Sequence, residues 1–241
     1  MNYVVSSTLG TSVMAAQQII LSIFYCLCPI ADSLNLTAQS FIPPIYGKKK
    51  TKDRTVDLQK MIKDFIKTSV IFGGVMASMV AGIPIISGLF TTDPVVISAV
   101  NGVVPLLMGI FSVHGLVMSG EGILLGQKDL SFLGTAFSLF FAVVPFVMIN
   151  KKKVAGDALT LNGLWHVFAG YQIARLAIWW ARVMYLNRKT VQETANLPLR
   201  VLDDFGFSEN SVGRPLNEIE GISVDPIDPP DKLLVTSPSF E

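Results

Sequence analysis

Five long apolar segments dominate the pattern of hydrophobic and polar positions along this chain. They cover Val13–Ile30, Ser69–Phe90, Val95–Met118, Phe132–Ile149 and Leu164–Val183. Each is close to the roughly 20 residues that cross a hydrocarbon core at about 1.5 Å per residue. Because backbone polar groups in lipid must pair within their own segment, we expect helices. The pattern therefore predicts an all-α, polytopic membrane helix bundle of about five transmembrane helices.

Proline, glycine and charged positions set the expected boundaries within a membrane region of residues 1–190. The expected helices cover approximately residues 11–45, 63–90, 105–126, 131–150 and 162–187. The third is expected to begin at Pro105, since Gly102 and Pro105 interrupt its apolar run, which leaves 94–104 as a short interfacial helix. Begun there, the helix would carry Glu121 about 24 Å along its axis, inside the hydrocarbon core, rather than about 40 Å along it.

Composition and local charge agree with a membrane protein. Hydrophobic residues make up 51% of the chain and charged residues 15%. The net charge of +1 gives no electrostatic basis for binding nucleic acid. A basic segment, Lys48–Arg54, predicts a cytoplasmic loop that is attracted to anionic lipid. Residues 191–241 lack a periodic apolar face and are predicted to form a mostly disordered cytoplasmic tail.

A few polar residues within the apolar segments are candidates for function, because a buried charge in lipid needs a partner, a cavity or a role. Asp32, Asn35 and Gln39 recur at helical spacing and form one polar face. That face either lines a water-filled cavity or forms hydrogen bonds between helices. Arg175 is either the counter-ion of a carboxylate or a snorkelling residue. Glu121 stands alone between two glycines at the end of an apolar run.

Catalytic and metal-binding patterns are absent from the sequence. It has no phosphate-binding GxxxxGK[ST] loop, no GxSxG elbow, no HExxH and no cluster of His and Cys. We therefore expect no catalytic residue, no metal site, no cofactor and no enzyme activity. A polytopic chain with isolated carboxylates is most simply a transporter or part of one.

Four local patterns, in order, resemble the second half of a MATE (multidrug and toxic compound extrusion) transporter of the plant type. The first resembles the family's eighth helix, the second the turn after its ninth, the third its tenth helix and the fourth its twelfth. They are VMAAQQIILSIFYCLCPIADSLNLTAQSFI (Val13–Ile42), GLFTTDPVV (Gly88–Val96), EGILLGQKD (Glu121–Asp129) and LWHVFAGYQIARL (Leu164–Leu176). The resemblance covers helices eight to twelve, and the family's first lobe and seventh helix have no counterpart in this sequence.

The resemblance implies roles for individual residues. Glu121 matches an acidic residue of the tenth helix that couples transport to a cation, and many members have Asp there. Asp32 matches an Asp of the eighth helix, although the neighbouring Ser33 and Ala38 depart from the commoner Gly. Arg175 matches an arginine of the twelfth helix with a structural role. The coupling ion would be a proton or sodium.

The resulting hypothesis is a cation-coupled antiporter, present as a partial copy, that exports a small organic solute. The solute is an organic cation, a drug or an organic acid, and Asp32, Asn35 and Gln39 would line its cavity. A first lobe would come from the full gene or from another chain. The rival hypothesis is a non-transporting membrane protein or scaffold. The sequence leaves the plasma, vacuolar and plastid membranes open as locations.

Overall fold

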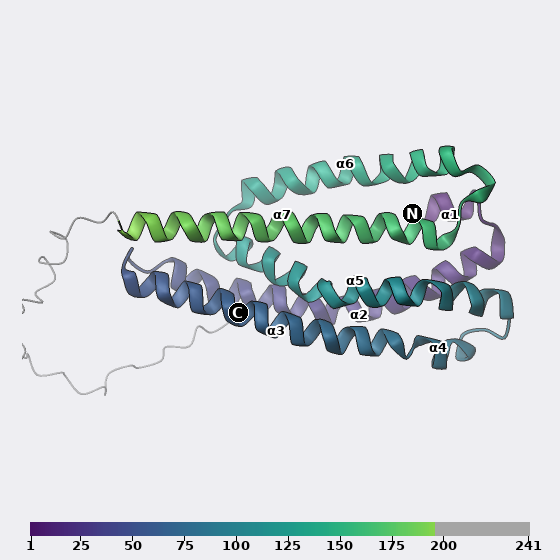
Figure 1. Cartoon of the computed structure of the whole chain (residues 1–241), viewed down its shortest axis with the longest axis horizontal. Helices are drawn as coiled ribbons and strands as arrows, with labels where there is room; N and C mark the ends of the chain where they lie inside the picture. Colours follow the sequence, from purple (N-terminus) through teal and green to yellow (C-terminus); the bar gives the residue numbers. More distant parts are fainter. Residues whose placement is uncertain (196–241) are drawn as a thin grey trace, which may run out of the picture. The chain divides into compact units, whose positions relative to one another are not determined.

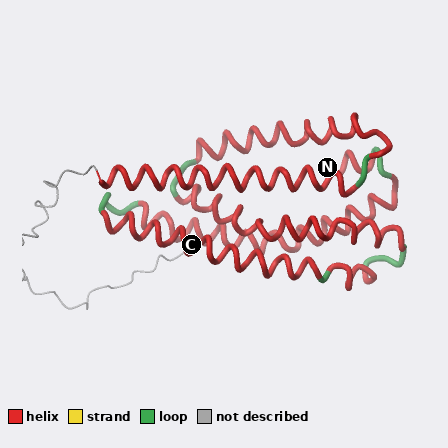
Figure 2. Tube along the Cα trace, in the orientation of Figure 1, coloured by secondary structure: helices red, strands yellow, loops and turns green. Residues whose placement is uncertain are grey.

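A computed structural model describes residues 1–195, and its regular elements over that range are all helical (Figure 2). Five helices are long: α2 (Gly10–Tyr46), α3 (Lys52–Ala81), α5 (Pro94–Gly126), α6 (Leu130–Ala155) and α7 (Leu161–Ala195). The short elements are α1 (Asn2–Ser6), α4 (Ile83–Ile86) and the 3-10 turns η1 (Ser87–Leu89) and η2 (Gly156–Ala158). The tail was predicted to begin at residue 191, but α7 continues to Ala195, so that boundary is wrong; residues 196–241 of the predicted tail lie outside the described residues.

Four of these segments are long and apolar enough to cross a membrane: α2, residues 52–89, α5 and α6. Helix α7 is similarly long, at 35 residues, but carries more polar side chains along its length. The prediction of an all-α, multi-pass membrane protein is confirmed.

The expected break at Pro105 is wrong, because α5 runs without interruption from Pro94 to Gly126. Its start is fixed by Asp93, whose carboxylate accepts a hydrogen bond of 2.9 Å from the backbone N–H of Val95. Pro105 is tolerated because Val104 and Leu107 beside it are buried against neighbouring helices, which hold this part of α5 in place. Glu121 therefore lies about 40 Å along α5 and not about 24 Å along it, so the depth that a start at Pro105 predicted for Glu121 is wrong.

Helix α3 also begins earlier than expected, at Lys52 instead of residue 63. The hydroxyl of Thr51 caps it by accepting from the backbone N–H of Arg54 at 3.3 Å. Leu58, Ile62 and Phe65 are buried along this first part of the helix. An apolar stripe at helical spacing thus runs through a segment whose lysines made it look like a loop.

Replacing Asp93 with alanine is expected to lower the free energy of unfolding by about 0.5–2 kcal/mol, since it removes the N-cap acceptor of α5. Asp93→Asn keeps an acceptor oxygen and should lose less. Chemical unfolding of the purified chain in mixed micelles measures both. Equal losses for the two variants would show that the cap is not the source of the effect.

Helix α5 lies at the centre of the described bundle and packs against α2, α3 and α7 (Figure 1). Close approach to α3 depends on Gly73, where an added Cβ would collide with the backbone carbonyl of Ser112. One turn away, the buried hydroxyls of Ser69 and Ser119 are hydrogen-bonded to each other. Helix α6 packs mainly on α7 and exposes apolar side chains such as Phe141 and Phe146, which suits contact with lipid.

The buried apolar residues form two clusters, one toward each end of the bundle. On α5 the first cluster ends at Phe111 and the second begins at Val117. On α7 the first ends at Trp165 and the second begins at Trp179. The polar side chains described next lie largely at the junction of these clusters.

Candidate functional site

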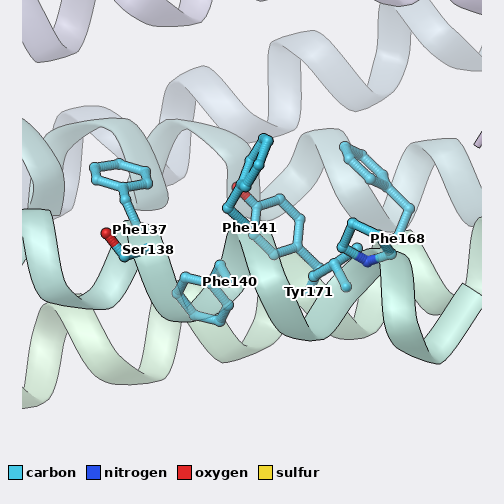
Figure 3. A pocket seen from close by; sticks show the side chains of 8 residues that line it. Phe137, Ser138, Phe140, Phe141, Phe168 and Tyr171 are labelled. Carbon is cyan, nitrogen blue, oxygen red and sulfur yellow. The ribbon is translucent and has the colours of Figure 1, made fainter.

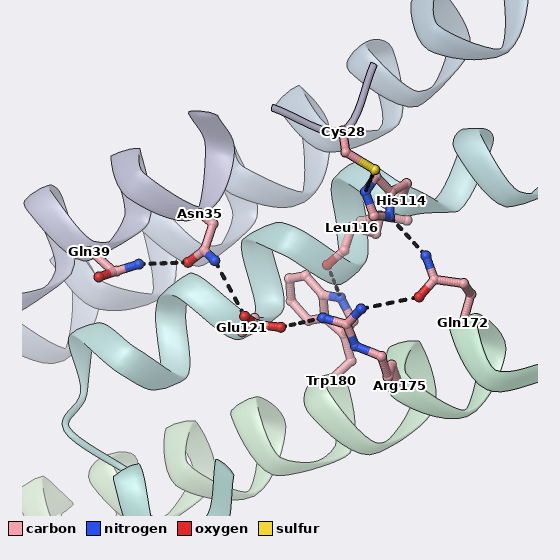
Figure 4. A network of polar contacts seen from close by, with 9 residues as sticks. All are labelled: Cys28, Asn35, Gln39, His114, Leu116, Glu121, Gln172, Arg175 and Trp180. Atoms are coloured by element: carbon pink, nitrogen blue, oxygen red, sulfur yellow. Dashed lines mark hydrogen bonds and ion pairs between the residues drawn. The ribbon is translucent and has the colours of Figure 1, made fainter. Parts of the chain in front are cut away.

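Glu121 is largely buried where α5 meets α2 and α7 (Figure 4). Its Oε2 forms an ion pair with Nη2 of Arg175 on α7. Its Oε1 accepts a hydrogen bond of 3.4 Å from Nδ2 of Asn35 on α2. The side chains of Arg175 and Glu121 are only 9% and 13% exposed, so this is a buried pair rather than a surface one.

Hydrogen bonds extend this pair in both directions. On the α2 side, Oδ1 of Asn35 accepts from Nε2 of Gln39 at 2.9 Å. On the α7 side, Nη1 of Arg175 donates to Oε1 of Gln172 at 3.2 Å. Figure 4 shows the resulting chain of polar contacts through α2, α5 and α7. Its members are Gln39, Asn35, Glu121, Arg175, Gln172, His114 and Cys28.

Gln172 sets the tautomer of a neutral His114. Its carbonyl oxygen faces Arg175, so its amide NH2 faces Nδ1 of His114, 2.9 Å away. An amide NH2 only donates, and Nδ1 must therefore accept. The proton of a neutral His114 then sits on Nε2, which lies 3.7 Å from Sγ of Cys28. A second proton on Nδ1 would place an N–H donor of His114 opposite the amide NH2 donor of Gln172.

Gly122 allows α2 and α5 to approach closely enough for the contact between Asn35 and Glu121. A Cβ added at Gly122 would lie 2.5 Å from the backbone oxygen of Asn35 and 2.8 Å from its Oδ1. At Gly126, one turn later, an added Cβ would lie 2.8 Å from Cβ of Ile42. The GxxxG spacing of these glycines is typical of closely packed membrane helices.

Comparison with known proteins identifies distant relatives of this chain. It is 29% identical to Protein DETOXIFICATION 47, chloroplastic, of Arabidopsis thaliana over 182 residues, which cover 74% of this chain and 32% of that protein. It is 26% identical over 156 residues to Protein DETOXIFICATION 44, chloroplastic, of the same plant, covering 65% of this chain and 29% of that protein. The chain is thus distantly similar to plant DETOXIFICATION (MATE) proteins.

The resemblance to plant-type MATE proteins is thus confirmed as a distant one. No family model and no solved structure matches the chain. The chain spans about a third of the length of the curated relatives it matches.

The structure brings some of the predicted site residues together. Asn35 and Gln39 lie in one network with Glu121, whereas Asp32 is exposed and forms no hydrogen bond or ion pair with another residue in the range 1–195. Arg175 is the counter-ion of Glu121, which decides between the two interpretations of that residue.

The sequence analysis did not name Gln172, Cys28 or His114 as candidate site residues. The spacing along the helices contains a signal for two of these residues, Gln172 and His114. Gln172 lies one turn before Arg175, and His114 lies two turns before Glu121, so each shares a helix face with a member of the ion pair. Cys28 has no comparable signal, because its position depends on how α2 packs against α5.

The hollow between α6 and α7 has a different chemistry from the polar network (Figure 3). It encloses about 590 Å³, and apolar and aromatic side chains such as Phe140, Phe141 and Phe168 line it together with Tyr171. No carboxylate or cation lines it. Such a surface suits an apolar chain, and it gives no counter-charge for a coupling ion.

Proposed function

We propose that this chain is part of the C-terminal lobe of a cation-coupled antiporter that exports a xenobiotic or an organic metabolite across a membrane. The single observation that carries the proposal is the burial of Glu121 at the junction of three helices, in an ion pair that polar groups extend on both sides. Homology to the DETOXIFICATION proteins supports it. Intramembrane ionisable residues commonly mark ion and substrate pathways.

The coupling step in this proposal is an exchange of partners at Glu121. Arg175 now neutralises the carboxylate. A proton bound to Glu121 would remove the negative charge, and sodium bound there would replace the guanidinium as its counter-charge. For sodium, Oδ1 of Asn35 is a further oxygen ligand close by. In either case Arg175 is released, and α7 becomes free to shift relative to α5.

The solute in this proposal binds beside the polar face of α2. Asp32 is exposed there, and Asn35 and Gln39 are half-buried on the same face. A carboxylate beside two amides suits a small organic cation or a drug with a basic group, and the amides alone suit an organic acid. Two lobes are needed to enclose such a site alternately from each side. The first lobe belongs to the full gene or to another chain.

A plastid membrane is the location we propose among the plasma, vacuolar and plastid membranes. The support is the word "chloroplastic" in the names of both relatives. Imaging of a fluorescent fusion in leaf cells tests the location, and a signal at the plasma membrane or the vacuole would overturn it.

Transport measured in vesicles tests the coupling role. The chain, alone and together with the first lobe of a DETOXIFICATION protein, is expressed in vesicles, and export of a fluorescent organic cation is followed under a proton or a sodium gradient. Glu121→Gln should abolish gradient-driven export, because glutamine carries no charge to exchange. The control Asp64→Asn removes an exposed carboxylate on α3 and should leave export unchanged. Export that survives Glu121→Gln would rule out the coupling role.

A non-transporting membrane protein or scaffold is the second candidate. Under this alternative the vesicles show no gradient-driven export with or without a first lobe, while the folded chain is still inserted in the membrane. The same assay therefore separates the two candidates.

A further inference from the structure

A basic cleft lies at the end of the bundle where α2 ends, α3 begins and α7 ends. It encloses about 380 Å³, which exceeds the volume of a phosphate group. The charged side chains that line it are Lys48, Lys49, Lys50, Arg54, Lys189 and Glu193. With five cations and one carboxylate, the lining is strongly positive.

Arg54 is the buried member of this basic cleft. The residue is only 5% exposed, and its Nε has no hydrogen-bond partner within the described part of the chain. Its guanidinium carbon lies 4.7 Å from the centre of the Tyr46 ring. A cation–π contact of this kind holds the group in place without using any of its N–H donors. A buried donor without an acceptor is costly, so an acceptor supplied by a ligand would stabilise Arg54.

Existing ion pairs leave the basic cleft positive. Lys48 pairs with Asp57 at 3.1 Å and Lys50 with Glu193 at 2.6 Å, and all four side chains are well exposed. The hydrogen bond from Lys50, with the charge of that residue and then of Lys189 and Arg54, holds the pKa of Glu193 below its ordinary value. A carboxylate there is thus surrounded by positive potential.

The position of the basic cleft suits a ligand at the membrane surface. Tyr46 ends the apolar helix α2, and tyrosine is enriched where a membrane helix meets the headgroups. Lys52 opens α3, a helix of 30 residues whose N-terminal dipole also favours an anion. The ligand chemistry that matches a buried guanidinium surrounded by lysines is a phosphate group.

We propose that the basic cleft binds a phosphate group, with Arg54 as its buried donor and Lys48, Lys50 and Lys189 around it. A lipid headgroup and free phosphate share this chemistry. The proposal is independent of transport, since it concerns the C-terminal end of α2 and none of the residues around Glu121.

Native mass spectrometry of the full chain in detergent tests the proposal with three probes. Dioleoyl phosphatidic acid supplies a lipid phosphate, dioleoylglycerol has the same acyl chains without phosphate, and inorganic phosphate supplies the free anion. We expect each chain to retain one ligand that carries a phosphate group, and we expect dioleoylglycerol not to be retained. Displacement of phosphatidic acid by millimolar inorganic phosphate assigns the cleft to a free anion, and its persistence assigns the cleft to a lipid.

Variants of the chain decide whether the retained phosphate lies in the basic cleft. Arg54→Gln should weaken retention roughly tenfold or more, because it removes charged hydrogen bonds. Lys189→Gln should also weaken it, and this exposed residue can be replaced without disturbing the core. The matched control Arg188→Gln changes an exposed neighbour outside the lining and should retain phosphate within about twofold. Equal losses in all three variants, or no loss in Lys189→Gln, would overturn the proposal.

Discussion

Replacing Arg175 with leucine is expected to lower the free energy of unfolding by about 3–5 kcal/mol, the cost of leaving a buried charge without its partner. Glu121 would keep only the hydrogen bond from Asn35 in a site that is 13% exposed. Unfolding of the purified chain in mixed micelles measures the change. The control is Lys48→Leu, since Lys48 pairs with Asp57 and both side chains are well exposed, at 57% and 49%. Its loss should be about 1 kcal/mol or less.

The double variant Glu121→Gln with Arg175→Leu should recover most of that stability. Removing both charges leaves no uncompensated ion, and buried pairs replaced by neutral groups are often as stable as the original. A double variant as unstable as Arg175→Leu alone would show that the loss came from packing around the arginine. Arg175 also contacts the rings of Phe137 and Tyr171, at 5.7 and 5.4 Å, so a small residual loss is expected.

The fold was predictable from length and hydropathy because lipid demands long, internally hydrogen-bonded helices. Its boundaries were less predictable. Pro105 was expected to end a helix, as it would in water, yet α5 continues through it, because packing on neighbouring helices holds the chain on both sides. The lysines before residue 63 were interpreted as a loop, yet an apolar stripe through Leu58 and Ile62 makes that segment helical and buried on one face.

The candidate site was predictable residue by residue but not as a network. Asn35 and Gln39 share a face of one helix, and helical spacing alone predicts this. The partners of Glu121 do not follow from spacing: Arg175 is 54 positions away and Asn35 is 86. These contacts depend on how three helices pack, which the local sequence does not specify. Asp32 shows the converse, since it shares the predicted polar face yet remains exposed outside the network.

The second large effect is expected at Gly122. Gly122→Ala should lower the free energy of unfolding by about 1–3 kcal/mol, as overpacking does elsewhere. The new Cβ would lie 2.5 Å from a backbone oxygen of Asn35 and 2.8 Å from Cβ of Ala38. A backbone oxygen has no alternative rotamer that would relieve the clash, so α2 and α5 must move apart. The Nδ2 of Asn35, already 3.4 Å from Glu121, would then lose its hydrogen bond.

Gly109→Ala on the same helix is the matched control, because an added Cβ there meets no atom within 4 Å. Alanine is favoured over glycine in a helix by about 1 kcal/mol, so this variant should be as stable as the original or more stable. The free energy of unfolding, measured in mixed micelles, should therefore fall for Gly122→Ala and stay the same or rise for Gly109→Ala. If Gly122→Ala is also neutral or stabilising, the close contact between α2 and α5 is not required, and Asn35 cannot owe its position beside Glu121 to that glycine.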